Sequence, residues 1–342
     1  MNQRPSTTNQ RHVPEWRKSL EAVLRKHNGV RYNGSTASDA TKAKRAKEIR
    51  AMIRTLREKG YKLNDIRNLK TKHVMVLVNH WKAQKLSAAT LQSKLSILRQ
   101  LAQWINKPNL VRATCHYFPN GEARRSSINK VDKSWTTRGI DVIAKFAEVR
   151  AQDPLEAVKL ELQVIMGLRM MESIQLQPHL ADTGTHLHIT KGAKGGKERL
   201  VAIDSPAKRA LVDQAKSLVK QGDSLSQASR NLKQAKDHFY YVLRKHGITR
   251  NQLGVTAHGL RHEYANNRYE EKTGVPSPVR GGGPVDPQID LTARREIAQE
   301  LGHCRPEVTA YYLGPMSSEK AASSAALTNQ PISKPTGKVM LA

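Results

Sequence analysis

Acidic side chains are scarce in this sequence of 342 residues: Asp and Glu number 29 against 58 Lys and Arg, so the formal net charge is +29. Cysteine is scarcer still, because Cys115 and Cys304 are the only two. Two cysteines cannot build a disulfide framework or a CxxC metal site, which excludes a disulfide-stapled secreted protein. The sequence therefore favours a reducing compartment, and we expect a cytoplasmic protein.

Long hydrophobic runs are also missing. No stretch approaches the ~20 consecutive apolar residues that a membrane span needs. The first residues, MNQRPSTTNQRHVPEWRK, lack the apolar core of a signal peptide. Leu, Ile and Val nevertheless recur along the whole chain, which argues against wholesale disorder. We therefore expect a folded protein with no membrane partner, and the length suggests two domains.

The excess of positive charge points to a polyanionic partner. Residues 1–130 carry 28 basic and 7 acidic side chains, whereas residues 131–342 carry 30 and 22. Nucleic acid is the polyanion that such a surplus most often binds, because each neutralised phosphate releases counterions. A generic basic surface is the alternative interpretation. The asymmetry predicts that the first part of the chain holds the nucleic acid and that the second part is a more ordinary folded domain.

The first part of the chain has the pattern of a helical bundle. Residues 1–13 are polar and basic, and we expect them to be flexible. Apolar residues at helical spacing predict helices at 14–27, 38–59, 72–84 and 87–105. We expect residues 14–106 to bind DNA through basic side chains, namely Lys42, Lys44, Arg45, Lys47, Arg50, Arg54 and Lys94. Solvated helix faces are the alternative interpretation of these charges.

The second part of the chain alternates helices with one hairpin. Residues 107–135 are rich in Pro, Gly, Asn, Ser and Arg, which predicts a linker before a domain at 136–315 and a polar tail at 316–342. Two β-branched runs, HLHIT and RLVAI, flank KGAKGGKE and predict a β-hairpin of strands 186–190 and 199–203. Helices are predicted at 138–150, 154–167, 206–221, 227–246, 258–271 and 292–302. The predicted fold class is mainly α with a small β-hairpin.

The common metal and nucleotide motifs fail in this sequence. His262 and Glu263 begin an HExxH pattern, but Asn266 stands where the second histidine must be. KGAKGGKE does not have the spacing of a phosphate-binding P-loop, and no acidic cluster suggests two-metal chemistry. We therefore expect neither a metal nor a cofactor. If a protein cuts phosphodiesters without a metal, its own side chains must supply both the positive charge and the nucleophile.

A set of side chains with that chemistry is present. HGLRHEY places His258 and Arg261 three residues apart, on one face of a helix. LGHCRPEVTAYY places His303 shortly before a tyrosine pair, GLRMMES places Arg169 after an apolar helix, and the hairpin connection carries Lys194. Arginine forks bind the non-bridging oxygens of a phosphate and oppose the charge that grows in the transition state. These groups could surround one phosphate, although each alone also has an ordinary structural interpretation.

In these motifs the sequence resembles the catalytic domain of the tyrosine recombinases, the phage-integrase family. The family has an arginine followed three residues later by an acidic residue, here Arg169 and Glu172, and a lysine before a KERLV-like strand. It also has HxLRH, and LGH with the nucleophile nine residues later. The match covers more than half of the chain, with the positions in family order. The resemblance implies six catalytic residues: Arg169, Lys194, His258, Arg261, His303 and Tyr312.

The resemblance also implies a mechanism and partners. The fold would be a two-domain, C-shaped clamp on double-stranded DNA, acting at attachment sites of a mobile element in a bacterial cell. Tyr312 would attack the scissile phosphate, expel the 5′-oxygen and form a 3′-phosphotyrosyl link that a second strand reseals without ATP or metal. A homotetramer would form in synapsis, with accessory factors that bend DNA. A type IB topoisomerase and a catalytically degenerate DNA-binding protein remain as alternatives.

Two assignments stay open within the resemblance. Tyr311 adjoins Tyr312, and the spacing rule favours Tyr312 as the nucleophile. Lys191 and Lys197 compete with Lys194 for the role of the hairpin lysine.

The chain also departs from the family between Arg261 and His303, where the connection is longer than usual. Residues 273–290 contain Pro-Ser-Pro and Gly-Gly-Gly-Pro, and they are predicted to form an irregular inserted loop. The insertion favours an integrase of a genomic island or an integrative conjugative element.

Overall fold

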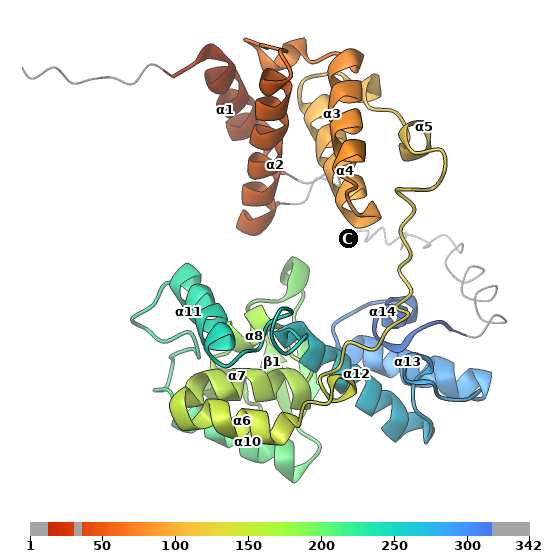
Figure 1. Cartoon of the computed structure of the whole chain (residues 1–342). Helices are drawn as coiled ribbons and strands as arrows, with labels where there is room; N and C mark the ends of the chain where they lie inside the picture. Colours follow the sequence, from red (N-terminus) through yellow and green to blue (C-terminus); the bar gives the residue numbers. More distant parts are fainter. Residues whose placement is uncertain (1–12, 31–35, 317–342) are drawn as a thin grey trace, which may run out of the picture. The chain divides into compact units, whose positions relative to one another are not determined.

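The computed structural model describes residues 13–30 and 36–316, which form two compact units divided between Arg125 and Ser126 (Figure 1). Most of the basic N-terminal segment 1–13 and of the tail 316–342 lies outside the described residues. Both units are built mainly from α-helices, and the strands found in the described part of the chain form one two-stranded sheet.

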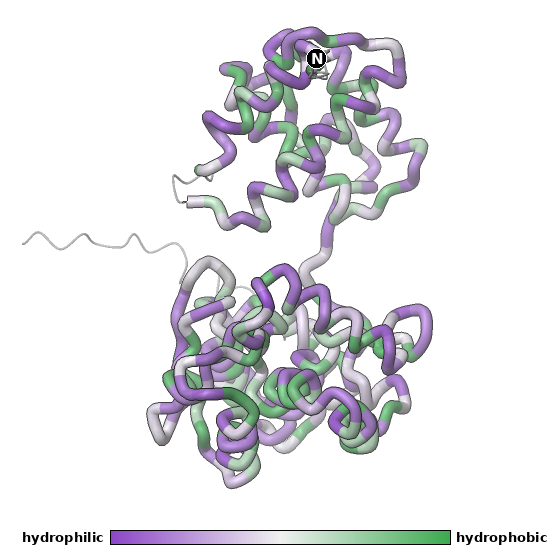
Figure 2. Tube along the Cα trace, turned by 90° about the vertical axis from the view of Figure 1, so that its left-hand side faces the viewer, coloured by the Kyte–Doolittle hydropathy of each residue, from purple (hydrophilic) through white to green (hydrophobic). Residues whose placement is uncertain are grey.

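The first unit contains the predicted helices, with ends that agree to within one residue: α1 (Glu15–His27), α2 (Asp39–Glu58), α3 (Thr71–Ala83) and α4 (Ala88–Trp104). Ser38 and Ser87 begin α2 and α4, and each side-chain oxygen accepts a hydrogen bond from the backbone N–H three residues later. Hydrophobic and hydrophilic residues interleave along these helices (Figure 2). Their apolar faces meet in one core that includes Leu20, Ile49 and Leu98.

The segment expected to be a linker, 107–135, is divided between the two units. Residues 107–125 continue the first unit, where Tyr117 and Phe118 are buried in its core. Residues 126–135 belong to the second unit, where Trp135 is fully buried and donates its indole N–H to the Thr256 carbonyl. Composition predicted a loose connection, but buried aromatic side chains tie both halves of the segment to packed cores. The short elements in the first half are η2 (Pro108–Leu110) and α5 (Thr114–Tyr117).

The predicted β-hairpin is confirmed in the second unit. Strands β1 (His186–Ile189) and β2 (Arg199–Ala202) are antiparallel, with His186 opposite Ala202 and Leu187 opposite Val201. Leu187 and Val201 are buried against neighbouring helices. The connection contains the short helix η4 (Lys194–Gly196), in which Gly195 has a φ of 79° that a side chain would resist.

Helix α7 is the centre of the second unit and packs against α6, α8, α10 and α12 (Figure 1). The helices of this unit are α6 (Val142–Gln152), α7 (Pro154–Ile165), α8 (Met170–Gln175), α9 (Pro178–Ala181), α10 (Pro206–Ser217), α11 (Leu232–Lys245), α12 (Ala257–Thr273), α13 (Pro287–Glu300) and α14 (Ala310–Leu313). Short helices η3 (Thr136–Arg138), η5 (Pro278–Arg280) and η6 (Pro306–Thr309) lie between them.

Helix α13 begins five residues before the predicted start at 292. The Asp286 side chain accepts hydrogen bonds from the N–H groups of Gln288 and Ile289, and Pro287 takes the first helical position. The irregular loop is therefore shorter than the predicted 273–290. The Gly- and Pro-rich composition hid the helix start, because Asp-Pro is also typical of a turn.

A core at one end of the second unit holds α12, α13 and α14 together. Its buried residues are Tyr264, Ala265, Tyr269, Ala293, Ile297, Leu301, Tyr312 and Leu313. The four-residue helix α14 could not be stable alone, so its position depends on this packing.

Candidate active site

Tyr312 is the residue around which the predicted groups gather. It lies in α14, packs on α12 and is 4% exposed. The Nε of Arg261 donates to its phenol oxygen over 3.2 Å. The ring centroids of His258 and His303 lie 6.1 and 6.2 Å from that of Tyr312.

Arg261 is held rigidly inside α12. It is 1% exposed, and its two terminal nitrogens donate to the carbonyls of Gly167 and Leu301. Burial lowers the pKa of Arg261 to about 10, and the neighbouring Tyr312 raises it in part. At neutral pH the guanidinium is therefore still charged. Gly167 has a φ of 61°, and a Cβ there would lie 2.7 Å from the Tyr264 ring, so this position requires glycine.

Arg169 joins Arg261 at the same backbone carbonyl. Its Nη2 donates to the Leu301 oxygen over 2.9 Å, and its Nη1 donates to Glu172 over 2.6 Å. Arg199, the first residue of β2, binds the second oxygen of Glu172 over 2.6 Å. Burial alone would raise the pKa of Glu172, but Arg199 and Arg169 outweigh it, so the pKa lies below its usual range. Glu172 is thus a buried carboxylate between two arginines.

His258 and His262 stand on one side of the tyrosine pair. Their ring centroids are 5.3 Å apart, and the His262 ring lies 4.9 Å from that of Tyr312. Crowding by protein atoms, then the charges of Arg261 and Lys133, lowers the pKa of His258 to about 4, although part of the residue is exposed. Burial and neighbouring positive charge lower the pKa of His262 to about 3. Both rings are therefore neutral at pH 7, and His258 can accept a proton or a hydrogen bond.

The remaining predicted residues are His303 and Lys194. His303 follows α13, and its N–H donates to the Ala298 carbonyl over 2.7 Å. Lys194 is the first residue of η4 in the hairpin connection, and its side chain lies outside the described part of the structure. The structure therefore brings together Arg169, His258, Arg261, His303 and Tyr312, and it leaves the predicted lysine untested.

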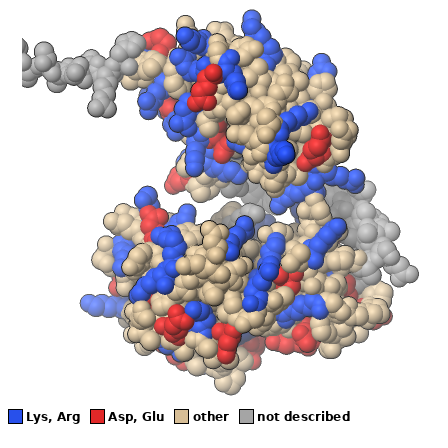
Figure 3. Space-filling model, viewed as in Figure 1, with Lys and Arg blue, Asp and Glu red and all other residues tan. Residues whose placement is uncertain are grey.

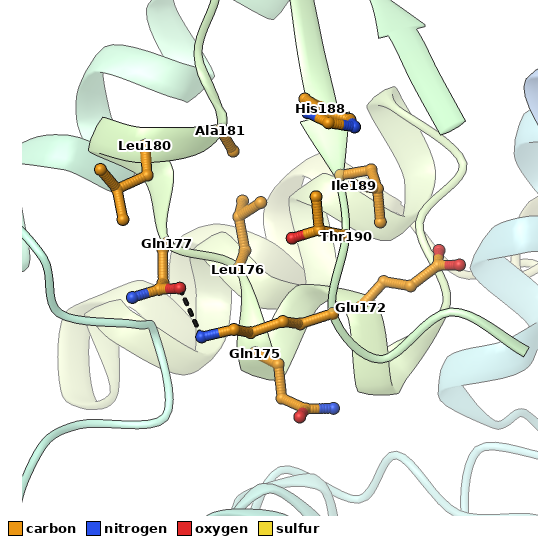
Figure 4. A pocket seen from close by; sticks show the side chains of 10 residues that line it. Glu172, Gln175, Leu176, Gln177, Leu180, Ala181, His188, Ile189 and Thr190 are labelled. Carbon is orange, nitrogen blue, oxygen red and sulfur yellow. Dashed lines mark hydrogen bonds between the residues drawn. The ribbon is translucent and has the colours of Figure 1, made fainter. Parts of the chain in front are cut away.

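The two competing lysines of the hairpin lie in different surroundings. Lys191 donates to Gln177 over 2.7 Å at a cavity that also includes Glu172 and His188 (Figure 4). Lys197 donates to the Cys304 sulfur over 3.1 Å, at a cavity of about 300 Å³ that His303 also lines. Lys197 is therefore the competitor that reaches the neighbourhood of the candidate site.

Sequence reasoning missed two arginines that support this site. One is Arg199, described above, and the signal that could have found it was its place in KERLV, the strand motif that follows the hairpin connection. Arg294 in α13 is fully buried, binds Asp290 over 2.8 Å and donates to the Pro315 carbonyl over 2.9 Å, just after α14. Buried arginines on helix faces resemble surface charges in a sequence, so only packing distinguishes them.

The basic side chains of the first unit differ in their surroundings (Figure 3). Lys42, Arg50 and Lys94 form ion pairs with Asp39, Glu21 and Glu48, and Arg45 donates to the Val30 carbonyl and lies over the Trp104 ring. Lys44, Lys47 and Arg54 are exposed on α2. Of the seven predicted side chains, these last three are therefore the most available to a partner.

Metal ligands and membrane spans are both missing from the part of the chain that the structure describes. Among residues 13–30 and 36–316, no group of three or more His, Cys, Asp or Glu side chains could hold a metal ion. Within the same residues, no helix has the length and apolar character to cross a membrane.

Comparison with known families places the chain. The family model described as "Phage integrase, N-terminal" matches residues 30–111, and the model described as "Integrase" matches residues 122–267. The two stretches together span more than half of the chain. A search of curated protein sequences found no significant match. The chain belongs to the tyrosine recombinase, or phage integrase, family, which confirms the predicted resemblance.

Solved structures share the fold. A lambda integrase dimer bound to a COC′ core site is 15% identical, with a TM-score of 0.52 over 95% of this chain and 99% of that chain. XerH site-specific recombinase bound to a palindromic difH substrate is 17% identical, with a TM-score of 0.52 over 91% and 84%. Tn1549 transposon integrase in complex with circular intermediate DNA is 13% identical, with a TM-score of 0.52 over 90% and 99%. The mainly α, two-domain fold class is therefore confirmed.

Proposed function

We propose that the protein is a site-specific DNA recombinase that cuts and rejoins strands through a 3′-phosphotyrosyl intermediate at Tyr312. The observation that carries the proposal is the contact of the buried Arg261 guanidinium with the Tyr312 phenol, with His258 and His303 beside the same ring. The terminal nitrogens of Arg261 hold α12 to the carbonyls of Gly167 and Leu301, and its Nε faces the phenol oxygen. A charged donor fixed at this place suits a phosphate bound at the phenol oxygen.

The two arginines would bind the non-bridging oxygens of that phosphate. Arg169 and Arg261 share the Leu301 carbonyl, so their forks are fixed next to each other. Glu172 prevents Arg169 from rotating away, because it accepts both from its guanidinium and from its backbone N–H. Preorganised cations of this kind stabilise the charge that develops in the transition state without reorganising.

The attack needs a route for the phenol proton. His258 is neutral at pH 7 and lies beside the tyrosine, so it would accept that proton or a hydrogen bond from it. His303 would bind the phosphate or the transition state. Lys194, at the hairpin connection, would protonate the departing 5′-oxygen. The new Tyr312–phosphate bond replaces the phosphodiester, so the 5′-hydroxyl of another strand can reverse the step without ATP.

The assembly and the role in the cell follow from the same proposal. One structural neighbour is a lambda integrase tetramer bound to a Holliday junction, at 13% identity and a TM-score of 0.54. We propose that this chain likewise forms a homotetramer on double-stranded DNA and exchanges strands at attachment sites. Integration or excision of a mobile element such as a genomic island or integrative conjugative element, with DNA-bending accessory factors, is the proposed biological role, inside the bacterial cytoplasm. The exposed Lys44, Lys47 and Arg54 would contact DNA phosphates.

The test uses nicked suicide duplexes built from the direct repeats that border the element carrying the gene. Wild-type protein should form an SDS-resistant covalent adduct, and Tyr312→Phe should bind the duplex yet form none. Tyr311→Phe is the matched control, because it removes the adjacent phenol, and it should retain the adduct. An adduct with Tyr312→Phe but not with Tyr311→Phe would contradict the assignment of the nucleophile. Relaxation of supercoiled DNA that lacks the repeats would instead indicate a type IB topoisomerase, and binding without any adduct a degenerate DNA-binding protein.

A further inference from the structure

The segment that leads into the second unit crosses the helices of the candidate site. Asn129 donates its N–H over 2.9 Å to the carbonyl of Ala310, the first residue of α14. Further on, the Lys133 carbonyl approaches α12 so closely that a Cβ on Gly259 would lie 2.6 Å from its oxygen. The glycine between the two site residues of HGLRH thus serves the approach of this segment. Lys133 is therefore fixed directly above the helix that carries His258 and Arg261.

Arg280 of the inserted loop fastens this segment to α12. Its Nε donates to Asp132 over 3.0 Å and its Nη2 donates to Glu263 of α12 over 2.9 Å. Both carboxylates are buried, with side-chain exposures of 2% and 4%. Thr136 also binds Glu263 through its backbone N–H and its hydroxyl, at 3.1 and 2.7 Å. One guanidinium therefore neutralises two buried carboxylates, one next to Lys133 in the chain and one on α12.

The same loop also contacts α12 and the residue that follows α14. Ser277 donates to Asn266, whose amide nitrogen donates to the His262 carbonyl over 2.8 Å. A Cβ on Gly314, which follows α14, would lie 3.0 Å from the Val279 nitrogen. The loop is therefore packed between α12 and the residues that end α14.

Lys133 presents its charge to the tyrosine pair. Its Nζ lies 4.9 Å from the centroid of the Tyr311 ring, and the residue is exposed. No carboxylate within the described residues forms an ion pair with it, and its neighbour Asp132 is saturated by other donors. Its positive charge also contributes to the low pKa of His258 and of His262. An ammonium held at this place is a point charge available to a phosphate.

We propose that Lys133 is a phosphate-binding residue of the cleavage site and that Arg280, from the inserted loop, is the positioning residue that holds it there. The inference rests on the proposed function, because it assigns Lys133 to a phosphate of the strand that Tyr312 attacks. It also gives the insertion between Arg261 and His303 a role, because the inserted loop holds the segment that contains Asn129 and Lys133 against α12 and α14.

The experiment measures the single-turnover rate of covalent adduct formation on the nicked duplex, at saturating protein, together with the dissociation constant. Lys133→Met keeps the apolar stem over Tyr311 and removes the charge, and we expect cleavage about tenfold slower or worse with binding changed less than about threefold. Lys133→Arg should restore the rate to within about threefold of wild type. Lys130→Met is the matched control, since Lys130 is an exposed lysine on the same segment, and it should cleave at the wild-type rate.

Arg280 is tested through its coupling to Lys133. Arg280→Ala should slow cleavage as Lys133→Met does, and the double variant should be no slower than the slower single variant, because both act on one interaction. Arg280→Lys should not restore the rate, because one ammonium cannot bridge Asp132 and Glu263 as the fork does. If the double variant slows cleavage by the product of the two single-variant factors, Arg280 does not act through Lys133.

The outcomes separate this inference from the proposed function. If wild-type protein forms no adduct, the proposed function fails and the inference fails with it. If wild type forms the adduct and Lys133→Met matches it in rate, the proposed function stands and the inference is overturned. Equal slowing by Lys130→Met and Lys133→Met would also overturn it, because a nonspecific charge effect would then explain the loss.

Discussion

Replacement of Glu172 by glutamine tests the electrostatic support of the site most directly. Glu172→Gln keeps the shape of the side chain but removes the charge that Arg169 and Arg199 share. The carboxylate is fully buried, whereas the two arginine side chains are 19% and 6% exposed. Breaking a buried pair from one side costs about 3–5 kcal/mol. The partial exposure of Arg169 lets water reach it, so we expect a loss near the lower figure, about 3 kcal/mol.

The pH dependence of this loss has a definite sign. Because the folded-state pKa of Glu172 lies below its usual value, its stabilising effect is present above the unfolded pKa of about 4.3. The effect disappears as the pH falls through the lower, folded-state pKa. The difference in unfolding free energy between wild type and Glu172→Gln should therefore be complete at pH 7 and shrink below about pH 4.

The assay is urea unfolding of the full chain at pH 7 and at several lower pH values, with adduct formation measured in parallel. Glu198→Gln is the matched control, since Glu198 is 60% exposed and, among the described residues, forms its ion pair with His188. That exposed pair should contribute about 0–1 kcal/mol at most. A Glu172→Gln protein within about 1 kcal/mol of wild type at pH 7 would refute the reasoning, as would a difference that does not change with pH.

Three further predictions follow from the geometry. Gly259→Ala should destabilise the protein by about 1–3 kcal/mol in denaturant unfolding, because its Cβ would overlap the Lys133 carbonyl; unchanged stability would contradict the close approach. Since the pKa of His258 is lowered to about 4, its neutral form persists as the pH falls, so the cleavage rate should stay flat from pH 8 to about 5; a midpoint near 6.5 would refute this role. Lys47→Gln should lower the salt slope of DNA binding by about 1, whereas the ion-paired Lys94→Gln should change it less; equal slopes would remove Lys47 from the DNA contacts.

Most helices could be predicted from the sequence because their signals are local. Apolar spacing and capping residues such as Ser38 and Ser87 lie within a few positions of the helix that they define. The start of α13 was wrong in the prediction because Asp286 and Pro287 sit in a stretch whose composition is that of a loop. Composition also predicted a linker at 107–135, and the boundary between the units falls inside it, but composition does not reveal that Tyr117 and Trp135 are buried in different cores.

The sequence by itself determined the family, the candidate nucleophile and the set of basic and histidine partners, because these are motifs with a defined order and spacing. Only the tertiary structure decided how they meet: Arg169 and Arg261 at one carbonyl, Glu172 between two arginines, and Lys133 above the tyrosine pair. The physical reason is that charge pairing and close packing depend on distances between segments that are separated in the chain, by 27 residues for Glu172 and Arg199 and by 132 for Arg169 and Leu301. A linear pattern specifies which side chains are available, whereas burial decides which of them are held in place.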